Sequence, residues 1–132
     1  MNGYCQIELG GELRGLKFNM HSIEIISRAD YEYVSDDKGN VEAKLKAKED
    51  TSFAAIVKFV YAGLCGNAFA KSGGIETICQ EKKEDIAEWV EDLFFSDKKA
   101  SFIKSVMEAY WSSKPMQKVI EDSKDEVKKK KR

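Results

Sequence analysis

The stretch Ile7-Glu8-Leu9-Gly10-Gly11-Glu12-Leu13-Arg14-Gly15-Leu16-Lys17-Phe18 decides how the N-terminal part of this chain folds. Over residues 4–9, apolar and polar residues alternate, which is typical of a strand with one buried face. Gly10-Gly11 then supplies the positive φ angles that a two-residue hairpin turn needs. The stretch therefore predicts a β-hairpin whose second strand spans residues 12–18. The residues expected on its inner face are Cys5, Ile7, Leu9, Leu16 and Phe18.

A lone hairpin is marginally stable in water, so this one must pack on helices. Asn19 is placed to cap a helix over residues 20–35, and the turn-forming residues 36–40 end it. Residues 41–50 are highly charged and weakly periodic. We expect them to form a connection with at most a helical turn.

Three stronger amphipathic helices are predicted further along the chain. The first is capped by Thr51 or Ser52, covers residues 53–64 with an extension toward Ala70, and is stopped by Ser72-Gly73-Gly74. The second starts near Thr77 or at Lys83, and the third opens at Ser96 and Asp97. Their apolar stripes are Ile86, Trp89, Val90, Leu93 and Phe94 in the second, and Ile103, Val106, Met107, Tyr110 and Trp111 in the third.

Lys114-Pro115 interrupts the helical pattern, because proline disfavours helix at the residue before it. Residues 116–132 then predict a last polar helix that frays into a basic end. The predicted fold is α+β and mostly α-helical, with an N-terminal two-stranded β-hairpin packed on a bundle of four to five helices. We expect one hairpin-plus-helix domain over residues 1–113 and a polar tail over residues 114–132.

The composition favours a soluble protein of a reducing compartment. Among 132 residues the formal net charge is only -1, so no whole-molecule field draws the chain to nucleic acid or anionic lipid. Three widely spaced cysteines do not indicate a disulfide framework. The N-terminus lacks the pattern of a secretory signal, and the longest apolar region, over residues 53–70, is interrupted by polar residues and glycines. We therefore expect a cytoplasmic protein that is neither secreted nor membrane-bound.

No constellation of residues in the sequence indicates catalysis. His21 is the single histidine, and no local motif pairs it with a cysteine nucleophile. Cys65 and Cys79 are too far apart in sequence for a zinc ligand pair. Acidic pairs such as Glu84-Asp85 fall on the polar faces of predicted helices, where a solvated surface explains them. We expect no enzyme activity, no metal and no cofactor.

Most aromatic residues near the C-terminal helices have core spacing, which packing explains, but two adjacent pairs do not fit one stripe. Phe94 and Phe95 are neighbours, as are Tyr110 and Trp111. Neighbouring residues of a helix lie about 100° apart, so both members of a pair cannot sit at the centre of one narrow stripe. Some of this surface is expected to be exposed and to bind a partner, since aromatic side chains anchor protein interfaces. The candidate contact residues are Phe94, Phe95, Tyr110, Trp111 and Met116.

The arrangement of the whole chain resembles the tail assembly chaperones of long-tailed (siphovirus-type) bacteriophages. The hairpin with its glycine turn and Leu16-Lys17-Phe18 is similar to the start of that family, and the resemblance extends over residues 4–112. It continues with the apolar helix, the glycine break, the acidic-aromatic segment around Trp89 and another amphipathic helix, in that order.

The resemblance implies that this protein binds the long helical tape-measure protein, keeps it soluble and helps tail-tube assembly in the cytoplasm of an infected bacterium. The implied partners are the tape-measure protein, the tail-tube protein and further copies of this chain. Two alternatives stay open. One is a generic helical adaptor or regulator, and the other is a nucleic-acid-binding protein that uses the basic run at residues 128–132, although upstream acidic residues dilute that charge.

Overall fold

The computed structural model describes residues 3–27, 31–35, 37–45 and 51–130. Within these residues the chain forms two separate antiparallel hairpins and five helices. The predicted α+β, mostly helical fold with an N-terminal hairpin is confirmed. The order is β1 (Tyr4–Leu9), β2 (Glu12–Lys17), α1 (Met20–Ser27), β3 (Tyr31–Ser35), β4 (Val41–Leu45), α2 (Phe53–Lys71), α3 (Lys83–Phe94), α4 (Lys99–Trp111) and α5 (Lys114–Lys130).

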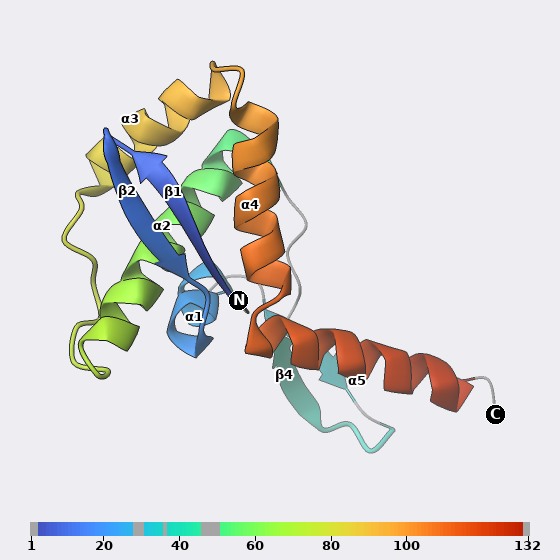
Figure 1. Ribbon diagram of the computed structural model, residues 1–132. Coiled ribbons are helices and arrows are strands. Elements are labelled where there is room, and N and C mark those ends of the chain that lie inside the picture. Colours follow the sequence, from blue (N-terminus) through green and yellow to red (C-terminus); the bar gives the residue numbers. More distant parts are fainter. Residues whose placement is uncertain (1–2, 28–30, 36, 46–50, 131–132) are drawn as a thin grey trace.

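The N-terminal hairpin pairs Tyr4 with Lys17 at its open end and Leu9 with Glu12 at its turn. The turn glycines adopt positive φ, 62° at Gly10 and 82° at Gly11, as the sequence predicts. Figure 1 shows the hairpin lying across α2, with α3 beside its turn and α1 beside its open end. Its inner face is buried at Ile7, Leu9, Leu16 and Phe18, so the predicted alternation is confirmed.

Helix α2 is the centre of the fold, because β2, α1, α3 and α4 all pack on it. It is therefore apolar around most of its circumference rather than along one stripe. Gly63 and Gly66, which interrupt the apolar pattern in the sequence, lie where neighbouring chain approaches most closely. A Cβ at Gly63 would lie 2.8 Å from Leu16 Cβ, and one at Gly66 would overlap Ser22 Oγ and the Lys17 carbonyl.

The predicted ends of α2 and α3 agree with the structure. The Ser52 hydroxyl accepts a hydrogen bond from the Ala55 amide at the start of α2, and the helix ends before Ser72. Of the two predicted starts for α3, the structure has the one at Lys83. Helix α4 begins at Lys99, after Ser96 and Asp97, and its buried stripe is Phe102, Val106, Ala109 and Tyr110.

The predicted helix over residues 20–35 is wrong in its second half. Asn19 caps it as expected, since its side-chain oxygen accepts from the Ser22 amide, but α1 ends at Ser27. Residues 31–35 instead form β3, which pairs with β4 from Tyr31↔Leu45 to Ser35↔Val41. Part of the charged segment expected to be a connection is thus a strand. Residues 36 and 46–50 lie outside the described part of the chain.

Helix α5 begins at Lys114 with Pro115 in its first turn, where a missing amide donor costs nothing. It extends away from the rest of the molecule (Figure 1). Met116 and Val119 attach its first turns to the core. The junction of α4 and α5 lies between Trp111 and Lys114.

Candidate protein-binding groove

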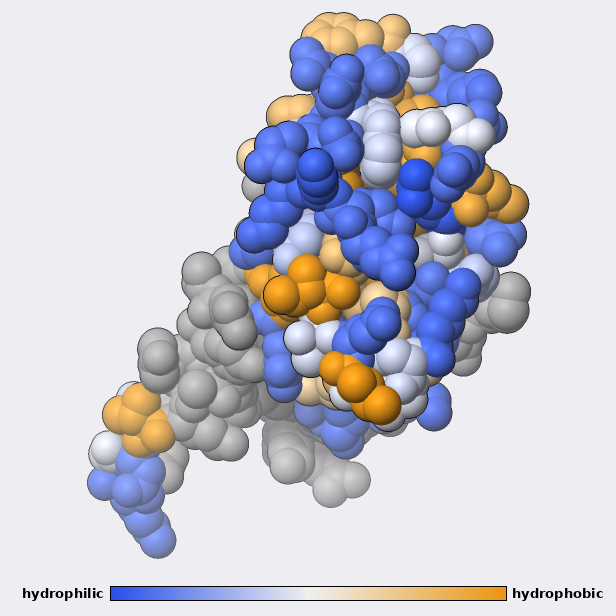
Figure 2. Space-filling view, turned by 90° about the vertical axis from the view of Figure 1, so that its left-hand side faces the viewer, coloured by the Kyte–Doolittle hydropathy of each residue, from blue (hydrophilic) through white to orange (hydrophobic). Residues whose placement is uncertain are grey.

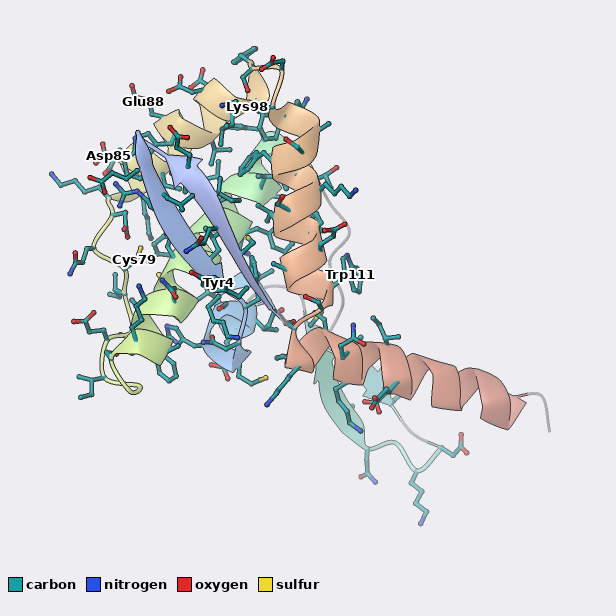
Figure 3. All side chains as sticks on the ribbon, viewed as in Figure 1. Tyr4, Cys79, Asp85, Glu88, Lys98 and Trp111 are labelled. Atoms are coloured by element: carbon teal, nitrogen blue, oxygen red, sulfur yellow. The ribbon has the colours of Figure 1, made fainter. Side chains whose placement is uncertain are left out.

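The structure separates the five predicted contact residues into two places. Phe94 and Phe95 lie at the end of α3, whereas Tyr110, Trp111 and Met116 lie around the junction of α4 and α5. Figure 3 labels Trp111 near this junction, at the far end of α4 from Lys98. A single surface made of all five residues is therefore excluded.

Tyr110 and Met116 are wrong as contact residues, because both are 0% exposed. The Tyr110 ring lies edge-on to Phe59 at 4.8 Å and to Phe18 at 6.0 Å between ring centroids. It joins α4 to the hairpin and to α2, so it is a core residue. Trp111 is half-buried against the Tyr110 ring at 5.2 Å.

Phe95 is the exposed member of its pair, with 86% of its surface accessible. Phe94 beside it is half-buried, its ring edge-on to Phe53 at 5.4 Å, and Lys99 Nζ lies 4.7 Å from its centroid. Phe53 itself is partly exposed. We call Phe53, Phe94 and Phe95 the aromatic end. The accessible ring of Phe95 is a feature that suits binding of another protein.

A groove of about 680 Å³ lies between the hairpin, α3 and the start of α4, and it was not predicted from the sequence. Figure 3 labels Glu88 on α3 and Lys98 at the start of α4, both at the end of the molecule where the hairpin turns. The groove is open to solvent. Its lining residues are Gln6, Ile7, Glu8, Gly10, Gly11, Glu88, Trp89, Asp92, Leu93, Ser96, Asp97, Lys98, Ser101, Phe102 and Ser105.

The floor and the rim of this groove differ in character. Its apolar lining comes from Ile7, Trp89, Leu93 and Phe102, which also pack against or belong to the core. Its charged lining is dominated by carboxylates, at Glu8, Glu88, Asp92 and Asp97, with Lys98 as the one cation among the lining residues. An apolar floor with an acidic rim suits a ligand that is apolar on one side and basic at its edges.

Trp89 holds the hairpin against α3 and so fixes one wall of the groove. Arg14 lies over the indole ring at 4.6 Å from its centroid. The same guanidinium donates to Glu81 Oε1 at 2.9 Å and, through Nε, to the Leu9 carbonyl at 3.1 Å. Arg14 therefore links the turn of the hairpin, the segment before α3 and Trp89 itself. The groove is bounded by elements that are fixed to one another.

Exposed apolar residues also lie on the connection between α2 and α3. Ile75 and Ile78 on this connection are among the most exposed apolar residues of the described chain. Figure 2 shows that the apolar residues of this face form separate islands among hydrophilic ones.

His21, the single histidine, packs against neighbouring residues. The His21 ring stacks on Phe69 at 4.7 Å, and its Nε2 lies 2.7 Å from the Thr77 carbonyl oxygen. His21 thus packs the end of α2 against the connection that follows it. Within the part of the chain that the structure describes, no group of three or more His, Cys, Asp or Glu side chains is placed to hold a metal ion.

One helix of the described chain, α2, has the length and apolar character to cross a membrane. Half of its most apolar window is buried inside the fold, and it forms the core described above.

Comparison of the chain with protein-family models, with curated proteins and with solved structures finds no match.

Proposed function

We propose that this protein is a non-enzymatic chaperone of the phage tail assembly type. In this proposal it binds amphipathic helices of the tape-measure protein and keeps that protein soluble while the tail tube is built. The observation that carries the proposal is the open groove with its apolar floor and acidic rim. Phe95, the residue before the groove-lining Ser96, adds an exposed aromatic ring.

We propose a helix as the ligand, because the apolar and acidic lining residues of the groove can meet an amphipathic surface. A helix docking in a groove presents apolar residues every three to four positions and keeps its charged residues at the edges. Trp89, Leu93 and Phe102 offer apolar contacts to such a stripe, and the carboxylates of Glu88 and Asp92 would meet lysines or arginines beside it. The Phe95 ring adds a further contact beyond the groove.

The identity of the helical partner comes from the resemblance rather than from the groove. The glycine-turn hairpin, the Leu16-Lys17-Phe18 strand and the order of helices α2 to α4 support a tail assembly chaperone. A tape-measure protein exposes long apolar helical stripes that aggregate unless they are covered. Such a partner also places the protein in the cytoplasm of the bacterial host, and the tail-tube protein is a second proposed partner.

Co-expression tests this function. The protein is produced together with the long coiled-coil protein encoded by the neighbouring gene, and the soluble fraction of that larger protein is measured. We expect the larger protein to become soluble only when this chain is present. Phe95→Ala should reduce the effect, whereas Leu13→Ala, at an exposed apolar residue outside the groove, should not.

Two results would contradict the proposal. If the larger protein stays insoluble with the wild-type chain, the tape measure is not the partner, and the generic adaptor is favoured. If the chain instead binds DNA in a salt-sensitive manner that deletion of residues 128–132 abolishes, the nucleic-acid alternative is favoured.

A further inference from the structure

Cys65 and Cys79 are in direct contact although the sequence separates them by 14 positions. Cys65 lies in the middle of α2, and Cys79 lies on the connection between α2 and α3, where Figure 3 labels it. The Cys79 amide donates to Cys65 Sγ at 3.4 Å. Cys65 is 0% exposed and Cys79 is 7% exposed, and both are free thiols.

The surroundings of this pair favour one thiolate and one thiol. Hydrogen bonding from the Cys79 side chain, followed by its amide and the Tyr61 hydroxyl, lowers the pKa of Cys65 to about 6 even though burial opposes the shift. The pKa of Cys79 moves in the opposite direction, chiefly because its side chain hydrogen-bonds Cys65. These opposite shifts favour Cys65 over Cys79 as the thiolate of the pair.

We propose that Cys65 and Cys79 form an oxidation site, in which Cys65 is the nucleophile toward a peroxide and Cys79 is the resolving thiol. The oxidant must be small, because Cys65 is 0% exposed and Cys79 is 7% exposed, so the proposal names a peroxide and not a bulky disulfide. This inference does not depend on the proposed function.

The reaction needs hydrogen peroxide as its only co-reactant. The Cys65 thiolate attacks one peroxide oxygen, the O–O bond breaks, and Cys65 sulfenic acid and hydroxide form. The Cys79 sulfur then attacks the Cys65 sulfur, the S–O bond breaks, and the Cys79 proton leaves with the hydroxyl group as water. The product is a Cys65–Cys79 disulfide, and the two electrons lost by the thiols have reduced the peroxide.

The disulfide would tie the connection between α2 and α3 to the central helix. This connection carries the exposed Ile75 and Ile78, and it also carries Glu81, which pairs with Arg14 at 2.9 Å. Oxidation would thus add a covalent link to the connection that carries Ile75 and Ile78, which only hydrogen bonds and packing hold in the reduced protein.

Peptide mapping of the intact protein tests the inference. The reduced chain is treated with hydrogen peroxide, its remaining thiols are alkylated, and it is digested with trypsin without reduction. Trypsin separates the three cysteines into residues 1–14, 59–71 and 72–82. We expect peptides 59–71 and 72–82 to be recovered as one cross-linked species that has lost two hydrogen atoms, and peptide 1–14 to be alkylated.

Matched variants separate the two roles. Cys5→Ser should leave the cross-link unchanged. Cys79→Ser should leave Cys65 as a sulfenic acid that dimedone traps on peptide 59–71, and Cys65→Ser should leave Cys79 free for alkylation. A cross-link that includes Cys5, or over-oxidation of Cys65 in the wild-type chain while Cys79 remains a free thiol, would overturn the inference. Because the wild-type map decides this alone, a variant that fails to fold does not weaken the test.

Discussion

The backbone of Gly10 lies against the indole ring of Trp89, so closely that a Cβ built on Gly10 would fall 2.5 Å from Trp89 Cε2. Glycine is required at position 10 for two reasons: its φ is 62°, and a side chain would occupy the space that Trp89 fills. This contact joins the turn of the N-terminal hairpin to α3. It also sets the position of Trp89, which forms part of the floor of the groove.

Gly10→Ala should destabilise the protein more than Gly11→Ala. Both glycines have positive φ, but a Cβ at Gly11 would meet no atom within 4 Å. Gly11→Ala should therefore lower the free energy of unfolding by about 1 kcal/mol through backbone strain alone. Gly10→Ala adds the clash with Trp89 and should cost roughly 2–4 kcal/mol. Urea denaturation measures both, and equal losses would show that the Trp89 contact is unimportant.

Gly66→Ala should be the most damaging of the glycine substitutions within α2. A Cβ there overlaps Ser22 Oγ and the Lys17 carbonyl, and the Gly66 carbonyl accepts from Asn19 Nδ2 at 3.0 Å. We expect a loss of about 3 kcal/mol or more, because backbone atoms cannot move aside as a flexible side chain can. The effect is measured by thermal or urea unfolding. Gly73→Ala, which also meets no atom, serves as the control, and a Gly66→Ala protein as stable as this control would refute the packing described here.

Phe95→Ala should change the free energy of unfolding far less than Tyr110→Ala. Phe95 is 86% exposed, so its removal should change the free energy of unfolding by less than about 0.5 kcal/mol. Tyr110 is a core ring, and its removal should cost roughly 3–5 kcal/mol. Circular dichroism during urea titration distinguishes the two. A Phe95→Ala protein that unfolds as readily as Tyr110→Ala would show that the aromatic end is structural.

Stability should fall as the pH rises above 9, and Cys5 should account for part of the fall. Burial raises the pKa of Cys5 from its ordinary value of 9.0 to about 11. Between these values the unfolded chain loses the Cys5 proton while the folded chain keeps it, so ionisation favours unfolding. The contribution should be on the order of 1–2 kcal/mol after allowance for partial exposure. Cys5→Ser should have a shallower decline across this range in urea midpoints, and parallel curves for the two proteins would contradict the assignment.

Much of the fold could be predicted because local signals and burial agree. The alternation around Gly10-Gly11 and the positions of α2 and α3 in the chain match the structure. The single apolar stripe predicted for α2 does not, because several elements pack around this helix. The second hairpin was missed because residues 31–35 contain Tyr33 and Val34, which also continue a helical pattern from Ile26. Their β-branched and aromatic character, followed by a turn with Gly39 at φ 82°, is the signal that favours a strand.

The site could be predicted only in part, since burial of an aromatic ring depends on which elements pack together. Phe95 is exposed because it follows the last residue of α3, whereas Tyr110 fills the space between α4, α2 and the hairpin. The acidic rim is contributed by three separate segments, through Glu8, then Glu88 and Asp92, then Asp97. No local pattern in the sequence brings these carboxylates together. The contact between Cys65 and Cys79 cannot be predicted either, because it also depends on how distant segments pack.

The most direct test of helix binding in the groove compares two charge reversals in the last turns of α3. Glu91 and Asp92 are adjacent and both exposed, but only Asp92 lines the groove. The probe is a synthetic amphipathic helix with lysines beside its apolar stripe, of the kind that the proposed partner would present, and its dissociation constant is measured by calorimetry. We predict that Asp92→Lys weakens binding by roughly tenfold, about 1.4 kcal/mol, and that Glu91→Lys leaves it nearly unchanged. Equal effects of the two substitutions, or no binding by the wild-type protein, would contradict the account.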